Sequence, residues 1–268
     1  MIVRLFCPVC TNEARQKLPR AVIDTPMPLV AVANDNEYQI RCDAGHVSAV
    51  FLDNLKFELL FEIGLHALVD GYPREAVSSF AASLERFYEF YWHVAVMKFS
   101  TPEAEHAQAW KTVAKQSERQ LGMFIASHVL LMKKSPVVLN SKEVKFRNDV
   151  VHGGYIPATG QAIEFGDKIM SLIRESLRDL RQEAPEALTS AYQKLSRHRE
   201  IPDEEIAGTI NILTAIDVRH PPEHDDDPRI GDVKSQFKRI SEERQPRKLE
   251  LLSREELKKR FPESQALK

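Results

Sequence analysis

The three cysteines of this 268-residue chain, Cys7, Cys10 and Cys42, all lie in the first 42 residues, and a histidine follows the last of them at His46. Together the four side chains read C-x2-C-x31-C-x3-H, which is two closely spaced pairs of soft or borderline donors. A tetrahedral zinc ion needs four such donors at about 2.0 to 2.3 Å. Because an odd number of cysteines does not suit a disulfide framework, we expect all four residues to bind one Zn²⁺ ion.

The residues around these pairs predict a small β domain over residues 1–53. Pro8 and Gly45 lie between the paired ligands, where they favour tight turns. Residues 38–41 and 47–51 have the pattern of two strands on either side of the second pair. This arrangement resembles a zinc ribbon, in which four protein ligands leave no open position on the metal, so we expect the zinc to be structural. The alternative is three free cysteines and an unrelated histidine.

Residues 54–200 change to a helical pattern, with apolar residues recurring every three or four positions. Short connections between long amphipathic helices favour an antiparallel bundle. The aromatic stripe from Phe80 to Tyr91 lies on one helix face, and we expect it to be core rather than a ligand-stacking surface. The predicted helices cover residues 55–70, a long segment that begins at Pro73, residues 101–133, a shorter helix with Asn140 and Glu143 as a capping box and Gly153-Gly154 as its end, residues 159–182, and a segment after Pro185.

The C-terminal extension, residues 201–268, is expected to be too charged to build a core of its own. From Glu223 onward 23 of 46 residues are charged, 11 acidic and 12 basic. Two helical pieces, roughly 232–244 and 253–260, can pack on the bundle or on a partner subunit. Residues 208–218 are apolar enough for either a docked strand or a short helix. The predicted fold class is therefore mainly α: an antiparallel helical bundle with a small N-terminal β zinc domain and a charged C-terminal tail.

The overall charge is close to balanced, with 37 Lys and Arg against 39 Asp and Glu and a net charge of -2. This balance excludes a protein that coats nucleic acid over its whole surface, so any such contact must be local. No apolar stretch reaches the roughly 18 residues of a membrane span, and the N-terminus has no secretory signal. We therefore expect a cytoplasmic protein without a membrane partner.

One short segment carries residues suited to chemistry: Arg147, Asn148 and His152 form an Arg-Asn-x3-His motif on a predicted helix that ends in two glycines. Within an all-helical bundle this motif resembles the HEPN superfamily, whose signature is an Arg, four to six residues and a His, often with a polar residue directly after the Arg. The resemblance covers roughly residues 55–184. It implies a metal-independent endoribonuclease that acts as a homodimer in toxin or antiviral defence, with an antitoxin or another defence-system component as a further candidate partner. Some members place a tyrosine two residues after the histidine for nucleotidylation by an antitoxin, whereas Tyr155 lies three residues after His152.

The residue types of the motif suit RNA cleavage by attack of the 2′-hydroxyl on the adjacent phosphate. His152 can move protons near neutral pH, because the unperturbed pKa of histidine is about 6.5. Arg147 offers phosphate a planar fork that stays charged, and Asn148 can orient either partner. These three residues are the predicted catalytic set.

The spacing of the motif bears on how it can be assembled. Five positions turn a helix by about 500°, so Arg147 and His152 point about 140° apart. A two-fold dimer, in which two copies of the motif face each other across one cleft, removes this difficulty. Residues 133–147 carry five basic residues and one acidic residue, which is typical of a phosphate-binding strip and also of an ordinary solvated helix face. RNA and a second copy of the chain are therefore the expected partners.

Other interpretations stay open. Arg147 can pair with Asp149 or with Glu85, and His152 can cap its helix, which would make the motif structural. The protein is then a non-catalytic adaptor that binds nucleic acid or a partner protein through its zinc domain, or a structural subunit of a defence complex. No P-loop, GxSxG, HExxH or dinucleotide-binding motif is present, so nothing supports an ATPase, serine hydrolase, metalloprotease or dehydrogenase.

Overall fold

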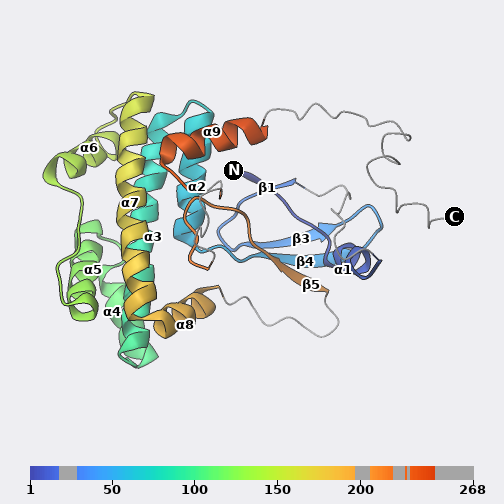
Figure 1. The fold of residues 1–268 in the computed structure, drawn as a ribbon, viewed down its shortest axis with the longest axis horizontal. Coiled ribbons are helices and arrows are strands. Elements are labelled where there is room, and N and C mark those ends of the chain that lie inside the picture. The colour runs from blue at the N-terminus through green and yellow to red at the C-terminus, as the bar shows by residue number, and fades with distance from the viewer. Residues whose placement is uncertain (18–28, 197–205, 220–226, 228–229, 245–268) are drawn as a thin grey trace.

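The computed structural model describes residues 1–17, 29–196, 206–219, 227 and 230–244. It shows two regions side by side, a helical bundle and a smaller β region with one short helix (Figure 1). The described residues are therefore mainly helical with a small sheet, as predicted.

The β region is built around a hairpin of β3 (Glu37–Arg41) and β4 (Val47–Leu52), which pair antiparallel with Gln39 opposite Ala49. These two strands confirm the prediction for the residues around the second ligand pair. A third strand, β5 (Ala207–Ile210), pairs with β4 in parallel, although it comes from a far later part of the chain. The first strand, β1 (Ile2–Arg4), pairs separately with β2 (Leu29–Ala31), and α1 (Pro8–Lys17) lies between them in the chain.

The bundle contains every helical segment predicted for it, with one correction. The single helix expected over residues 101–133 is two helices, which are separated at residues 114–116. At the break, the side-chain Nε2 of Gln120 donates to the carbonyl of Ala114 at 2.6 Å, so a backbone group left free there is satisfied. None of the described helices is long and apolar enough to cross a membrane. The bounds are α2 (Lys56–Val69), α3 (Pro73–Lys98), α4 (Glu103–Val113), α5 (Ser117–Met132), α6 (Ser141–Val151), α7 (Thr159–Glu183) and α8 (Pro185–Leu195).

The central helix of the bundle is α3, and α2, α5, α6, α7 and α8 all pack against it. Its aromatic stripe is core, as predicted, since Phe80, Phe87 and Tyr91 are at most 1% exposed. The ring of Phe80 lies between two glycines: a Cβ at Gly64 of α2 or at Gly166 of α7 would come within 2.5 or 2.7 Å of it. The two glycines therefore let α2 and α7 approach α3 closely around this ring.

Residues 206–219, which we call the strap, connect the two regions. The strap begins with β5 beside β4 and then runs in irregular conformation over α2 of the bundle (Figure 1). The choice left open for residues 208–218 is thus resolved as a strand up to Ile210 followed by a non-helical segment. Further along, α9 (Val233–Arg244) packs on α2 and α7 and confirms the first helix predicted for the tail, whereas the second, residues 253–260, lies outside the described residues.

Candidate metal centre and candidate active-site helix

The first ligand pair lies at the start of a helix. Cys7 directly precedes α1, and Pro8 occupies the first helical position, where the N–H that proline lacks is not needed. The N–H of Thr11 donates to the carbonyl of Cys7 at 3.0 Å and closes the first turn. Cys10, three residues after Cys7, lies on the same side of that turn. The tight turn expected between these cysteines is therefore a helical turn, because Pro8 is pre-organised for a helix start.

The second ligand pair lies in the turn of the β3–β4 hairpin. Cys42 directly follows β3 and His46 directly precedes β4. Gly45 has a φ of 86°, a conformation that favours glycine, as the predicted tight turn requires. The N–H of Cys42 donates to the carbonyl of His46 at 3.1 Å, and the N–H of Gly45 donates to the carbonyl of Cys42 at 2.8 Å. These bonds hold both ligands of the pair in one rigid loop.

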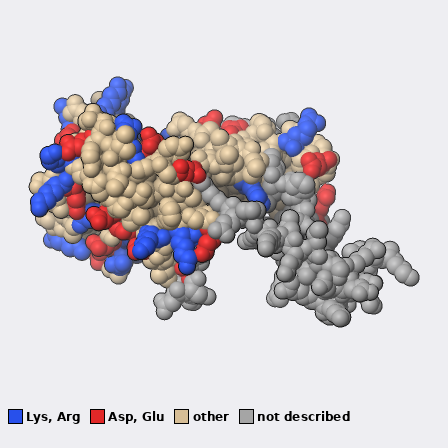
Figure 2. Space-filling model, turned by 90° about the horizontal axis from the view of Figure 1, so that it is seen from above, with Lys and Arg blue, Asp and Glu red and all other residues tan. Residues whose placement is uncertain are grey.

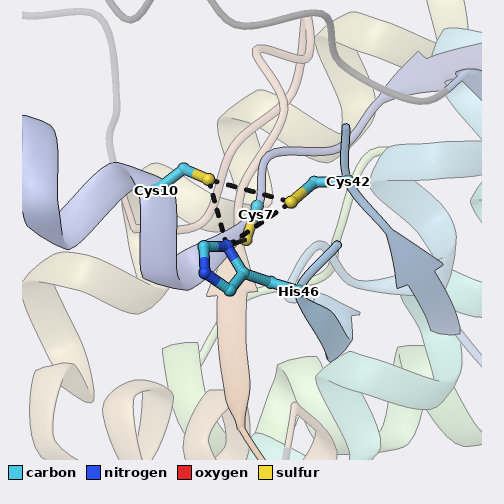
Figure 3. A group of neighbouring side chains, drawn as sticks. All are labelled: Cys7, Cys10, Cys42 and His46. Carbon is cyan, nitrogen blue, oxygen red and sulfur yellow. Dashed lines mark hydrogen bonds between the residues drawn. The ribbon is translucent and has the colours of Figure 1, made fainter. Parts of the chain in front are cut away.

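The fold brings the four predicted ligands together (Figure 3). Their donor atoms all lie within 4.8 Å of one another. The Nδ1 of His46 is 3.3 Å from the sulfur of Cys10, 3.5 Å from that of Cys42 and 3.7 Å from that of Cys7, and the sulfurs of Cys10 and Cys42 are 3.8 Å apart. Tetrahedral zinc, with bonds of about 2.3 Å to sulfur and about 2.0 Å to nitrogen, has edges of about 3.8 Å between sulfurs and about 3.5 Å between sulfur and nitrogen. The cluster therefore has the size and the donor set of a tetrahedral metal site.

The thiols of the cluster influence one another's ionisation. Burial raises the pKa of Cys42, but hydrogen bonds from the backbone N–H of His46 and from the thiol of Cys10 outweigh burial, and the pKa falls to about 7. The pKa of Cys10 is raised to about 12, by burial first and then by its hydrogen bonds with the other two thiols. Metal is bound by thiolates, and three thiolates this close repel each other. A divalent cation among them removes that repulsion, so the donor set fits a metal ion.

The Arg-Asn-x3-His motif lies on α6, whose two ends follow the predicted signals. The side-chain oxygen of Asn140 accepts from the N–H groups of Lys142 and Glu143 at 2.9 and 3.1 Å, and the carboxylate of Glu143 accepts from the N–H of Asn140 at 2.7 Å. At the other end, a Cβ at Gly153 would lie 2.8 Å from the carbonyl oxygen of Asp149, so only glycine fits there. Capped at its start and stopped at its end, α6 packs on α3 at one end of the bundle.

Arg147 contacts α3 and is paired there. Its Nη1 lies 3.3 Å from a carboxylate oxygen of Glu85, while the other carboxylate considered from the sequence, Asp149, pairs with Lys145 at 2.5 Å. The side chain of Arg147 is 15% exposed, and its buried Nε has no hydrogen-bond partner among the described residues. It lines a pocket of about 90 Å³ together with Glu85 and Tyr88. Arg147 is therefore paired with a carboxylate of α3, and its buried Nε has no partner among the described residues.

His152 lies on a different face of α6. It is the C-cap residue of the helix, it is exposed, and its N–H donates to the carbonyl of Asn148 at 2.9 Å. Arg147 faces the bundle while His152 faces solvent, as the angular separation of about 140° predicts. Within the part of the chain that the structure describes, no hydrogen bond or ion pair joins the two. The structure thus places all three motif residues on one helix but does not bring Arg147 and His152 together within one copy of the chain.

The basic stretch at residues 133–147 is largely neutralised by carboxylates. On the face of the bundle shown in Figure 2, Lys and Arg are interspersed with Asp and Glu rather than gathered into one patch. Lys133 and Lys142 are the two cations of this stretch without a carboxylate partner among the described residues, which weakens the prediction of a phosphate-binding strip. The ion pairs are Lys134 with Asp179 at 2.8 Å, Lys145 with Asp149 at 2.5 Å and Arg147 with Glu85 at 3.3 Å.

A buried polar network beneath the strap was not predicted. Glu58 and Glu62 lie four residues apart on α2, and each is 2% exposed. The N–H of Val218 donates to Glu58 at 2.7 Å, and the N–H of Ala215 donates to Glu62 at 3.0 Å. The composition of α2 could have indicated this network, because the helix is apolar on nearly all sides. Its two carboxylates therefore have to be buried, and buried carboxylates need hydrogen-bond donors.

The two candidate sites have different chemical capacities. The Cys3His cluster can hold a metal ion, and α6 carries an exposed histidine and an arginine that lines a small pocket. Comparisons of the chain with family models, with curated proteins and with solved structures find no significant match.

Proposed function

We propose that this protein is a metal-independent endoribonuclease of the HEPN type, with an N-terminal region held by a structural zinc ion. The observation that carries this proposal is the placement of Arg147, Asn148 and His152 on one short, capped helix at the end of a helical bundle. Exposure of His152 leaves it accessible to RNA. Arg147 lines a small pocket and keeps 15% of its side chain exposed, so its guanidinium is the candidate contact for a phosphate oxygen.

In the proposed reaction the 2′-oxygen attacks the adjacent phosphorus and the 5′-oxygen leaves. The products are a 2′,3′-cyclic phosphate and a 5′-hydroxyl. His152 transfers protons, an effect typically worth about 10² to 10⁴ in rate. Arg147 stabilises the charge that builds on the phosphoryl oxygens, and Asn148 orients the phosphate or the histidine. Zinc at the Cys3His cluster has four protein ligands and serves the fold alone.

A homodimer is part of the proposal, because one copy of α6 directs Arg147 and His152 to different faces. Tyr155 and Ile156 lie three and four residues after His152 and are 44% and 73% exposed. Exposed apolar side chains of this kind suit a protein interface. A two-fold contact at this end of the bundle brings two copies of the motif into one cleft. The role in toxin or antiviral defence, with an antitoxin or another defence partner, follows from the HEPN resemblance alone.

The test is an RNA cleavage assay in EDTA, at a concentration that leaves the bound zinc in place. Wild-type protein should cleave single-stranded RNA and leave DNA of the same sequence intact, because DNA lacks the attacking hydroxyl. His152→Ala should lose cleavage and keep RNA binding, whereas Arg147→Ala should lower both and Arg147→Lys should restore little. Arg74→Ala, at a partly exposed arginine of α3, is the matched control and should cleave like wild type. Equal cleavage by His152→Ala and wild type contradicts the proposed mechanism.

A second candidate function is a non-catalytic adaptor, and the contacts of the motif favour it. Arg147 pairs with Glu85 and His152 caps α6, so both have structural roles. An adaptor would bind RNA or a partner protein without cleaving RNA. Wild-type protein that binds RNA but releases no cyclic phosphate would support the adaptor over the enzyme.

A further inference from the structure

The strap begins directly beside the metal cluster. In β5, a Cβ at Gly208 would lie 2.7 Å from the ring of Pro8, the residue that follows Cys7 and precedes α1 in the first ligand pair. Ile210 at the end of β5 belongs to the same buried apolar cluster as Cys7. The strand on which β5 pairs, β4, starts directly after His46. Both ligand pairs therefore adjoin the surfaces that hold the strap in the sheet.

After β5, the strap forms hydrogen bonds with residues just before α2 and with residues of α2. The N–H of Asp53 donates to the carbonyl of Ile210 at 2.8 Å. The side-chain amide of Asn54 forms two hydrogen bonds with the backbone of Ile212, at 2.9 and 3.1 Å. Further along, the backbone N–H groups of Ala215 and Val218 bind the buried carboxylates of α2. One continuous run of hydrogen bonds thus leads from the metal cluster to the bundle.

The opposite side of the strap is held by arginines of α7. Arg174 donates to the carbonyl of Ala215 at 2.8 Å, and Arg181 donates to the carbonyls of Asp217 and Val218 at 3.0 and 3.2 Å. The same part of the strap also buries Ala215, Ile216 and Val218, each at most 5% exposed, in the apolar core of the bundle. The second half of the strap is therefore held by the bundle itself, whereas its first half, residues 206–212, is held by the sheet beside the metal cluster.

We propose that metal binding at the Cys3His cluster keeps the first half of the strap, residues 206–212, docked in the sheet and that loss of the metal releases it, so that this half is a metal-dependent latch between the two regions. The metal fixes Cys7, and with it Pro8, against Gly208, and it fixes the start of β4 through His46. Without the metal the two ligand pairs are no longer joined, and β5 loses the surface on which it packs. The inference rests on the proposed metal binding and is independent of the proposed ribonuclease activity.

Hydrogen exchange followed by mass spectrometry on the full chain tests the latch, with zinc-loaded protein compared with protein treated with a zinc chelator. Peptides that cover residues 207–212 should exchange at least tenfold faster after chelation and recover when zinc is added back. Peptides of α3 and α7 should keep their protection. Unchanged strap protection in the metal-free protein overturns the latch. Equal loss of protection in α3 and α7 also overturns it, because the metal then stabilises the whole chain.

A pair of glycine variants separates the latch from the metal site itself. Gly208→Ala places a methyl group against Pro8 without touching a ligand, so the strap should open while one zinc ion per chain remains bound. Gly122→Ala is the matched control, because it adds the same methyl group on α5 where nothing lies within 4 Å, and its strap should stay protected. Gly208→Ala with full strap protection contradicts the proposed contact. Absence of zinc from wild-type protein purified with zinc contradicts the metal centre before the strap is measured, so the two failures are distinguishable.

Discussion

The β region and the bundle are held together in different ways. The β region has short strands and a small apolar cluster, to which one of the proposed metal ligands, Cys7, itself belongs. The bundle has a continuous core of aromatic and aliphatic side chains around α3. A small core does not offset the conformational entropy of the chain that forms it, so a small region needs a metal or another cross-link. In this chain the four side chains that could hold a metal lie where the core is small, and the two regions should therefore respond differently to substitution.

The largest expected effect is the loss of a metal ligand. Cys42→Ser should remove the bound zinc and unfold the β region, since structural zinc sites supply about 10 to 16 kcal/mol in small zinc-binding peptides. Metal analysis should fall from one zinc per chain to none, while far-UV circular dichroism keeps the helical signal of the bundle. Asp43→Ala, at an exposed neighbour that is not a ligand, is the control and should keep its zinc. A Cys42→Ser protein of unchanged metal content and thermal stability would show that the β region does not depend on a metal at this cluster.

The next effect concerns the core of the bundle. Phe80→Ala leaves a cavity between α2, α3 and α7, and the free energy of unfolding should fall by about 3 to 5 kcal/mol. Denaturant titration measures this loss, and zinc content should stay at one per chain. Tyr72→Ala, at a tyrosine that is 60% exposed, should change the free energy of unfolding by less than about 0.5 kcal/mol. Loss of zinc from Phe80→Ala would show that the two regions do not have separate sources of stability.

A smaller, pH-dependent effect is expected at the junction of α3 and α4. The ring of His93 is 9% exposed and packs edge-on against His106 at 5.1 Å. Burial, aided by the charges of His106 and Lys194, lowers the pKa of His93 to about 4. Between about pH 6.5 and pH 4 the unfolded chain therefore binds a proton that the folded chain does not, so stability is lost as the pH falls.

The magnitude follows from the size of the pKa shift. At about 1.4 kcal/mol per pKa unit, His93 should lower the free energy of unfolding by about 2 to 3 kcal/mol between pH 7 and pH 4. Denaturant titrations at both pH values measure the loss, and His93→Gln should show a loss smaller by that amount. Equal pH dependence of the two proteins would exclude His93 as the cause.

The smallest effect is expected at the start of α6. Asn140→Ala removes the side chain that accepts from two backbone N–H groups, and it should cost about 1 kcal/mol. Amides of the first turn of α6 should exchange faster while α3 keeps its protection. Asn140→Asp retains an acceptor and should be close to neutral, so an equal loss in both variants would indicate a cause other than the cap.

Much of the molecule follows from local patterns. The ligand set Cys7, Cys10, Cys42 and His46 was evident because a metal requires particular donor types at short spacings, and the structure brings all four together. The helices of the bundle were evident from apolar periodicity, and the ends of α6 from its capping box and its glycines. Even the divergence of Arg147 and His152 followed from the geometry of one helix. Such features depend on residues that are near one another in the chain, and the sequence alone determined them.

Other features were decided only by contacts between distant residues. The pairing of β5 with β4, the burial of Glu58 and Glu62 under the strap, and the choice of Glu85 over Asp149 as the partner of Arg147 join segments far apart in the chain. The break between α4 and α5 was also not predictable from the sequence, because residues 114–116 contain neither glycine nor proline. Periodicity tells which face of an element is buried, but not which element covers that face. That choice rests on how all the elements pack together, and the tertiary structure alone supplied it.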